Sequence, residues 1–279
     1  MYLQTSAEPH IQPPAGSPVY NNINVGMAAP SFSVFSVGTV LSRTFSTLFK
    51  HPFVFIGLCV LAQFPVFIVR LAAGEAIAMI APIMVSVLGL IIQGAVAYGV
   101  YEVLRGNAAQ FGSSLSRGMA RIISLIFGGL LVGACFVLIL LVGIIGIIGL
   151  LASGIIMSLV VALPMILLMI FLWCKWVVFI PICVVERLGP IASLSRSSEL
   201  TYSCRLKIFV LSLLGFTILS VVMTVTAILV VIHPIFSIVE LLVDAVPLAF
   251  FNVMTAVIYY ELRSVKEGVS IDSLANVFD

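Results

Sequence analysis

Six apolar segments, each about 20 residues or longer, recur along this chain of 279 residues. An α-helix of about 20 apolar residues can cross the roughly 30 Å hydrocarbon core of a bilayer. The segments cover about 53–73, 77–104, 122–149, 154–185 and 206–232, and the last one ends near Tyr260. Only 9% of the residues are charged, whereas soluble chains carry about 25%. The sequence therefore predicts an all-α integral membrane protein with six transmembrane helices.

Two of the segment boundaries stay open. The fourth segment is too long for a straight perpendicular span, so we expect tilt, a kink at Pro164 or Pro181, or a last turn that lies in the interface. The sixth segment begins somewhere between Ile235 and Pro247.

The basic residues are concentrated on one side of the six segments. Arg70 lies near the opposite side and Lys175 lies within the fourth segment, whereas the other basic residues share one side: Arg43, Lys50, Arg105, Arg117, Arg121, Arg187, Arg196, Arg205, Lys207, Arg263 and Lys266. The positive-inside rule places this side and both chain termini in the cytoplasm. Together with the apolar composition, this pattern predicts a multi-pass membrane protein with both termini in the cytoplasm.

The tripeptide Leu-Ser-Arg occurs three times, at 41–43, 115–117 and 194–196, each time just before an odd-numbered segment. Apolar residues recur at three- and four-residue spacing around the first two copies, opposite a polar stripe: Val34, Val37, Leu41, Phe45 and Leu48 in the first, and Phe111, Leu115, Met119, Ile122 and Ile126 in the second. This period predicts amphipathic helices. The third copy has a less complete apolar face.

A glutamate followed within three residues by an arginine ends every even-numbered segment, at Glu102, Glu186 and Glu261. Units that each contain two spans keep the same orientation in the membrane. We therefore expect three parallel repeats of one amphipathic helix and two spans, at about 32–106, 107–187 and 188–264. Residues 1–31, rich in Pro, Ala, Asn and Gly, are expected to form a flexible arm, and residues 265–279 a cytoplasmic tail.

The predicted amphipathic helices could lie in the headgroup plane of the membrane. Their basic residues Arg43, Arg117, Arg121 and Arg196 would then contact anionic lipid or a partner protein at the cytoplasmic leaflet. The alternative is that these helices are collars packed against the spans, and the two interpretations are compatible.

Four polar residues within the segments could form an intramembrane site, because ionisable groups at membrane depth are costly and often functional. These residues are Gln93, Lys175, Asp244 and Asn252. An early start of the sixth segment would place Asp244 in a span, where it could face a cavity; a late start would leave it in an exposed turn. Lys175 could instead extend toward the interface beside the neighbouring tryptophans.

No catalytic, cofactor-binding or metal-binding motif is visible, and we expect the chain to be non-enzymatic, without cofactors or nucleic-acid partners. The five cysteines have no spacing typical of a disulfide framework or a zinc site. An intramembrane lipid-modifying activity stays open.

Two stretches, WVVFIPICVVERLGPIASLSR (176–196) and TAVIYYELRSVKEGVSIDSL (255–274), resemble the glycerophosphoryl diester phosphodiesterase membrane-domain group of prokaryotic proteins, which includes YciC-like proteins. The likeness extends loosely over about residues 32–275. Members fused to a phosphodiesterase barrel give the group its name, and this chain has no such barrel. The resemblance therefore implies a protein of a prokaryotic cytoplasmic (inner) membrane without transferable catalytic residues.

The function that these patterns favour is that of a scaffold or accessory subunit, which organises lipid or a membrane or cytoplasmic partner through its amphipathic helices. The alternative is a transporter or channel for a small solute or lipid, with a pathway between the repeats. The oligomeric state stays open.

Overall fold

A computed structural model describes residues 35–72, 81–151, 155–233 and 237–268, which belong to one compact unit. All regular elements among them are helices, and six of these are long and apolar enough to cross a membrane. The predicted all-α membrane protein is thereby confirmed. The predicted arm (1–31) lies outside the described residues, and so does the tail beyond Gly268.

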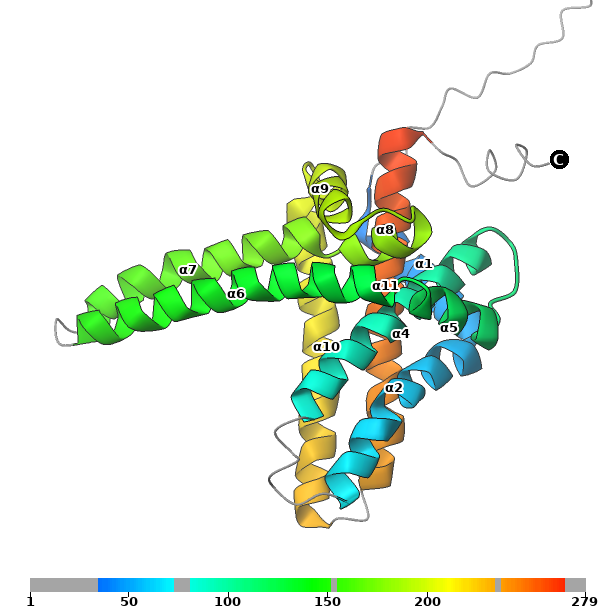
Figure 1. Cartoon of the computed structure of the whole chain (residues 1–279), viewed down its shortest axis with the longest axis horizontal. Helices are drawn as coiled ribbons and strands as arrows, with labels where there is room; N and C mark the ends of the chain where they lie inside the picture. The colour runs from blue at the N-terminus through cyan, green and yellow to red at the C-terminus, as the bar shows by residue number, and fades with distance from the viewer. Residues whose placement is uncertain (1–34, 73–80, 152–154, 234–236, 269–279) are drawn as a thin grey trace, which may run out of the picture. The chain divides into compact units, whose positions relative to one another are not determined.

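The helices follow the order short, long, long three times along the chain (Figure 1). The first group is α1 (Val37–Lys50), α2 (Pro52–Ala72) and α4 (Ala81–Leu104). The second is α5 (Phe111–Met119), α6 (Ile122–Leu151) and α7 (Ile155–Trp176), followed by the short α8 (Phe179–Val185). The third is α9 (Pro190–Thr201), α10 (Arg205–Ile232) and α11 (Ser237–Glu267).

The fourth apolar segment is divided after Trp176, where α7 ends and a turn leads to α8. Pro164 lies inside α7 and Pro181 inside α8. The segment is therefore shortened by a break between two helices, which is none of the three arrangements that we expected. Nearly all of α8 is buried against its neighbours.

Helix α11 lies at the centre of the packed unit. It begins at Ser237, so the early start of the sixth segment is correct and Pro247 lies within the helix. About 72% of its spanning portion is buried, and it packs against α10, α2, α1 and α4. Its inward side chains, including Met254, Ile258 and Tyr259, are among the largest fully buried residues of the described chain.

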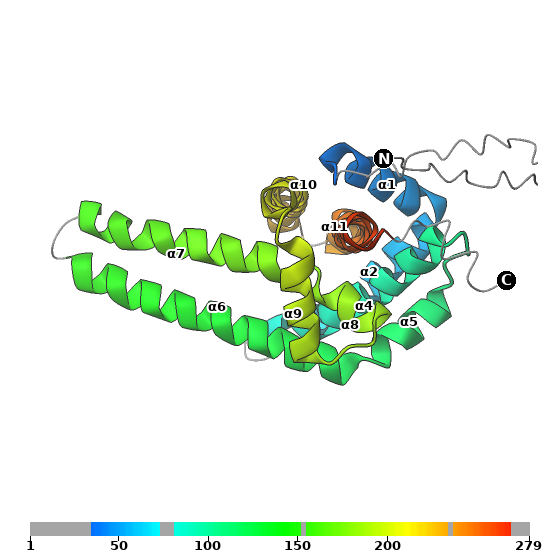
Figure 2. The ribbon, with the colours of Figure 1, turned by 90° about the horizontal axis from the view of Figure 1, so that it is seen from above.

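Helices α6 and α7 form an antiparallel hairpin that extends away from the other helices, across the direction of α10 and α11 (Figures 1 and 2). Only 6% of the α6 spanning portion is buried, and Ile145 and Ile148 are 69% and 67% exposed. Helices that are apolar on all sides and exposed are typical of membrane spans, because lipid covers the side chains that the protein does not.

Candidate functional site

The short helix α1 buries two threonines against the protein, beside Val40 and Leu48, and exposes two phenylalanines. Thr44 and Thr47 are 0% and 3% exposed, whereas Phe45 and Phe49 are 46% and 72% exposed. The Thr44 hydroxyl donates to the Val40 carbonyl within the helix at 2.7 Å, so its burial leaves no unpaired hydrogen. Part of the predicted apolar face of this helix therefore lies at the surface.

Helices α5 and α9 show the same distribution. Ser114 and Gly118 of α5 are buried, while Met119 is 54% exposed. Ser193, Ser197 and Thr201 of α9 are buried together with Leu200, while Ile191 is 73% exposed. Each of the three short helices therefore buries small residues and exposes at least one large apolar residue, although Leu48 of α1 and Leu200 of α9 are buried as well.

Small residues allow these helices to approach the spans closely. The approach is tightest at Gly118 of α5, where an added Cβ would lie 2.7 Å from the Ile91 carbonyl oxygen and 2.8 Å from the Ala95 amide nitrogen of α4. Since backbone atoms cannot yield as a flexible side chain can, glycine is the residue that fits this contact.

Each short helix packs on the second long helix of the group that precedes it. Helix α5 lies on α4, and α9 lies on α7 and α8. Helix α1, which has no preceding group, lies on α11 of the last group, and Figure 2 shows α1 beside α11. The same docking relationship therefore occurs three times. Because α1 of the first group packs on α11 of the last, the three groups contact one another in a closed ring.

The arginines of the three Leu-Ser-Arg copies lie at the contacts between neighbouring groups of this ring. Arg43 of α1 forms an ion pair with Glu261 of α11, and Arg196 of α9 lies 3.5 Å from Glu186, which follows α8. Both partners are among the glutamates that end the even-numbered segments. Each of these two arginines therefore contacts the glutamate of the preceding group in cyclic order.

In the remaining contact of the ring, Tyr98 of α4 lies between the arginine and the glutamate. The Cζ atom of Arg117 on α5 is 5.5 Å from the Tyr98 ring centroid, and the Tyr98 hydroxyl interacts with both Arg117 and Glu102. The order is again cyclic, because Arg117 belongs to the second group and Glu102 to the first.

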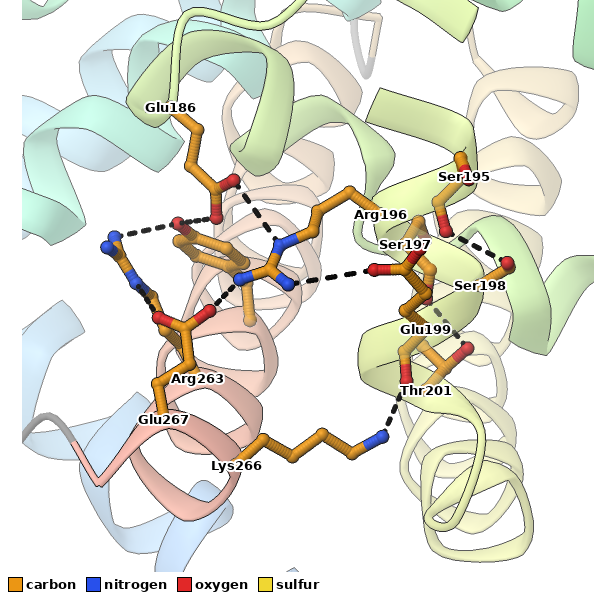
Figure 3. Close-up of polar contacts among 11 residues, drawn as sticks. Glu186, Ser195, Arg196, Ser197, Ser198, Glu199, Thr201, Arg263, Lys266 and Glu267 are labelled. Atoms are coloured by element: carbon orange, nitrogen blue, oxygen red, sulfur yellow. Dashed lines mark hydrogen bonds and ion pairs between the residues drawn. The ribbon is translucent and has the colours of Figure 1, made fainter. Parts of the chain in front are cut away.

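Arg196 lies at the centre of a larger polar network, shown in Figure 3. Its guanidinium contacts the carboxylates of Glu186, Glu199 and Glu267. Around it, the Tyr259 hydroxyl donates to Glu186 at 2.9 Å, Arg263 pairs with Glu267 at 2.8 Å, and the Lys266 ammonium donates to the Glu199 carbonyl. The network joins α9 to the last turn of α11, beyond the predicted end of the third repeat.

Lipid contact by the four predicted arginines stays a prediction, and the structure distinguishes among them. Arg43 and Arg196 have protein carboxylates as partners, whereas Arg117 is exposed and Arg121 half-exposed. Sequence reasoning missed Tyr98, Tyr259 and Glu267, which carry no repeated motif and are recognised only through their spatial neighbours.

The four predicted intramembrane polar residues have separate surroundings. Asp244 is 5% exposed and accepts a hydrogen bond from Thr226 of α10 at 2.8 Å. Asn252 is 7% exposed and donates to Cys59 Sγ of α2 at 3.8 Å.

Gln93 is half-buried on α4, and Lys175, near the end of α7, has its Nζ 5.6 Å from the Trp176 ring centroid. A shallow apolar depression along α10 is lined by Ser220, Met223, Thr224, Ala227, Ile228, Val231 and Ile232, and so contains none of the four.

Comparison with known proteins finds no matching family model, no matching curated protein and no matching solved structure. The resemblance to the phosphodiesterase membrane-domain group therefore stays a prediction. Among the residues that the structure describes, no group of three His, Cys, Asp or Glu side chains is arranged to hold a metal ion, and all five cysteines are free.

Proposed function

We propose that this chain is a non-enzymatic polytopic protein of a prokaryotic cytoplasmic membrane, with both termini in the cytoplasm. It acts as a scaffold or accessory subunit that contacts anionic lipid or partner proteins at the cytoplasmic leaflet through its short amphipathic helices. Three parallel repeats carry this activity, each with one in-plane helix and two spans.

The observation that carries the proposal is the outward apolar face of the three short helices. A collar helix in water would bury its large apolar side chains and expose its hydroxyls. Here Phe49, Met119 and Ile191 are exposed while the hydroxyls of Thr44 and Ser197 are buried. An outward apolar face beside cationic side chains is what a helix at the headgroup boundary requires. The exposed Lys50, next to Phe49, provides such a cation.

Lipid titration of the full chain tests this proposal. We expect the purified protein in detergent to retain phosphatidylglycerol more strongly than phosphatidylcholine in native mass spectrometry, because cationic side chains favour an anionic headgroup. Equal retention of the two lipids would remove the support for a lipid-organising role.

A transporter is the second candidate, and the buried Asp244 favours it, since a carboxylate at membrane depth often marks an ion or proton pathway. Its hydrogen bond from Thr226 agrees equally with a structural role between α10 and α11. Proteoliposomes under a pH gradient separate the two. A proton flux that Asp244→Asn abolishes would establish transport, and equal passive flux through parent and variant would favour the scaffold.

A further inference from the structure

Arg205, the first residue of α10, differs from the arginines of the ring in its surroundings. Among the described residues, no carboxylate pairs with it, and its Nε hydrogen is buried without a hydrogen-bond acceptor. A buried donor of a charged group without an acceptor is destabilising, because its lost hydration is not replaced. Such a group indicates a missing partner, and that partner must be an acceptor, since guanidinium only donates.

Two aromatic rings hold this guanidinium. Its Cζ atom lies 4.6 Å from the ring centroid of Phe171 on α7 and 5.3 Å from that of Tyr202, which follows α9. Guanidinium stacks on aromatic rings with its planar fork still able to bind an oxyanion. The orientation of the side chain is therefore set by the protein before any ligand binds.

The start of α10 adds a second source of donors. Its N-cap residue, Cys204, makes no side-chain capping bond, and the first turn has no acidic residue. The backbone N–H groups of a helix N-terminus favour an anion. The nearby Lys207 does not meet this need, because its ammonium donates to the Phe35 carbonyl at 2.7 Å.

The rim of this region is apolar and exposed. Phe171 is 45% exposed, Tyr202 74% and Leu206 77%. A soluble anion needs no such rim, whereas a phospholipid would place its acyl chains along these residues and its phosphate at the guanidinium. Exposed aromatic side chains are typical of the depth at which lipid phosphates meet the hydrocarbon.

We propose that Arg205, between Phe171 and Tyr202, binds the phosphate of an anionic phospholipid headgroup. The proposal rests on the proposed function, since it names one site for the lipid contact assigned there. It also places that contact on a residue outside the Leu-Ser-Arg copies.

The experiment titrates the full-length protein in detergent with phosphatidylglycerol and reads bound lipid by native mass spectrometry. We expect Arg205→Gln to weaken phosphatidylglycerol binding about tenfold or more, because a charge-assisted hydrogen bond is lost. Arg205→Lys, which keeps the charge but not the planar group, should show an intermediate loss. Arg187→Gln, which removes an exposed cation between α8 and α9, is the matched control and should bind phosphatidylglycerol as the parent does.

Two results would overturn the assignment. In the first, Arg205→Gln and Arg205→Lys both bind phosphatidylglycerol as tightly as the parent. In the second, inorganic phosphate alone displaces the lipid and binds as tightly as phosphatidylglycerol does. A parent without preference for phosphatidylglycerol over phosphatidylcholine would instead contradict the proposed function itself. If the parent prefers phosphatidylglycerol and Arg205→Gln keeps this preference undiminished, only the site at Arg205 is contradicted.

Discussion

At the residue scale, buried hydroxyl groups of α9 donate hydrogen bonds to a backbone carbonyl at the end of α7. Helix α7 ends at Trp176, and the carbonyl groups of its last turn lose their helical partners. Ser197 of α9 donates to the Lys175 carbonyl at 2.8 Å, and Thr201 contacts the same oxygen at 3.4 Å. The serine of α9 therefore has a specific acceptor on another helix, which explains why a polar residue faces the spans.

Ser197→Ala should lower the free energy of unfolding by about 1 kcal/mol, because a buried carbonyl loses a hydrogen bond. The neighbouring Ser198→Ala is the control. Ser198 bonds locally, to the Ser195 carbonyl at 2.9 Å within α9, and its loss should change stability by no more than about 0.5 kcal/mol. Thermal unfolding in one detergent compares the two, and equal effects would contradict the interhelical role of Ser197.

At the scale of elements, close backbone contact positions the short helices on the spans. Helix α5 provides an internal comparison, since a Cβ at Gly118 would meet the backbone of α4 at 2.7 Å, while a Cβ at Gly112 would meet nothing within 4 Å. Both glycines lie on α5, but Gly118 faces the backbone of α4 whereas Gly112 faces open space.

The substitutions Gly118→Ala and Gly112→Ala should therefore have opposite signs. We expect Gly118→Ala to destabilise the protein by about 1–3 kcal/mol through overpacking, and Gly112→Ala to stabilise it by up to about 1 kcal/mol through helix propensity. Unfolding midpoints measure both. A Gly118→Ala protein as stable as the parent would show that α5 does not approach α4 as described.

At the scale of the whole molecule, the ring of docked helices closes where the first group meets the last. Glu261 is 4% exposed, and its ion pair with Arg43 joins α1 to α11. A carboxylate buried this deeply requires a cation, so the pair links the two ends of the described chain.

Charge exchange tests this closure. Arg43→Glu and Glu261→Arg should each cost about 1–3 kcal/mol, less than the 3–5 kcal/mol of a fully buried pair because the Arg43 side chain is 40% exposed. The double variant should recover a large part of the loss, since it restores opposite charges. Additive losses in the double variant would show that the two residues do not interact.

The sequence predicted the six spans and the three short helices, because length, composition and period determine these. The cytoplasmic position of the basic residues stays a prediction. The sequence left open which face of each short helix is buried. An apolar side chain such as Phe45 or Phe49 is expected in the core when the helix faces water, but at the surface when the helix faces lipid. The sequence also could not pair Arg43 with Glu261, because long-range partners depend on packing. Arg205 carried no motif and was recognised only from its aromatic neighbours and its missing acceptor.

The outward apolar face of the short helices is tested most directly by spin labels on cysteines introduced into the full-length protein in bilayers. The native Cys135 and Cys204, which are not buried, are first replaced by serine. Labels at Phe49, Met119 and Ile191 are compared with labels at the exposed serines of the three Leu-Ser-Arg copies, Ser42, Ser116 and Ser195.

We predict that the first three labels collide mainly with oxygen, which concentrates in lipid, and that the serine labels collide mainly with a water-soluble nickel chelate. Equal access of the nickel chelate to both sets would contradict the placement of these helices at the membrane boundary.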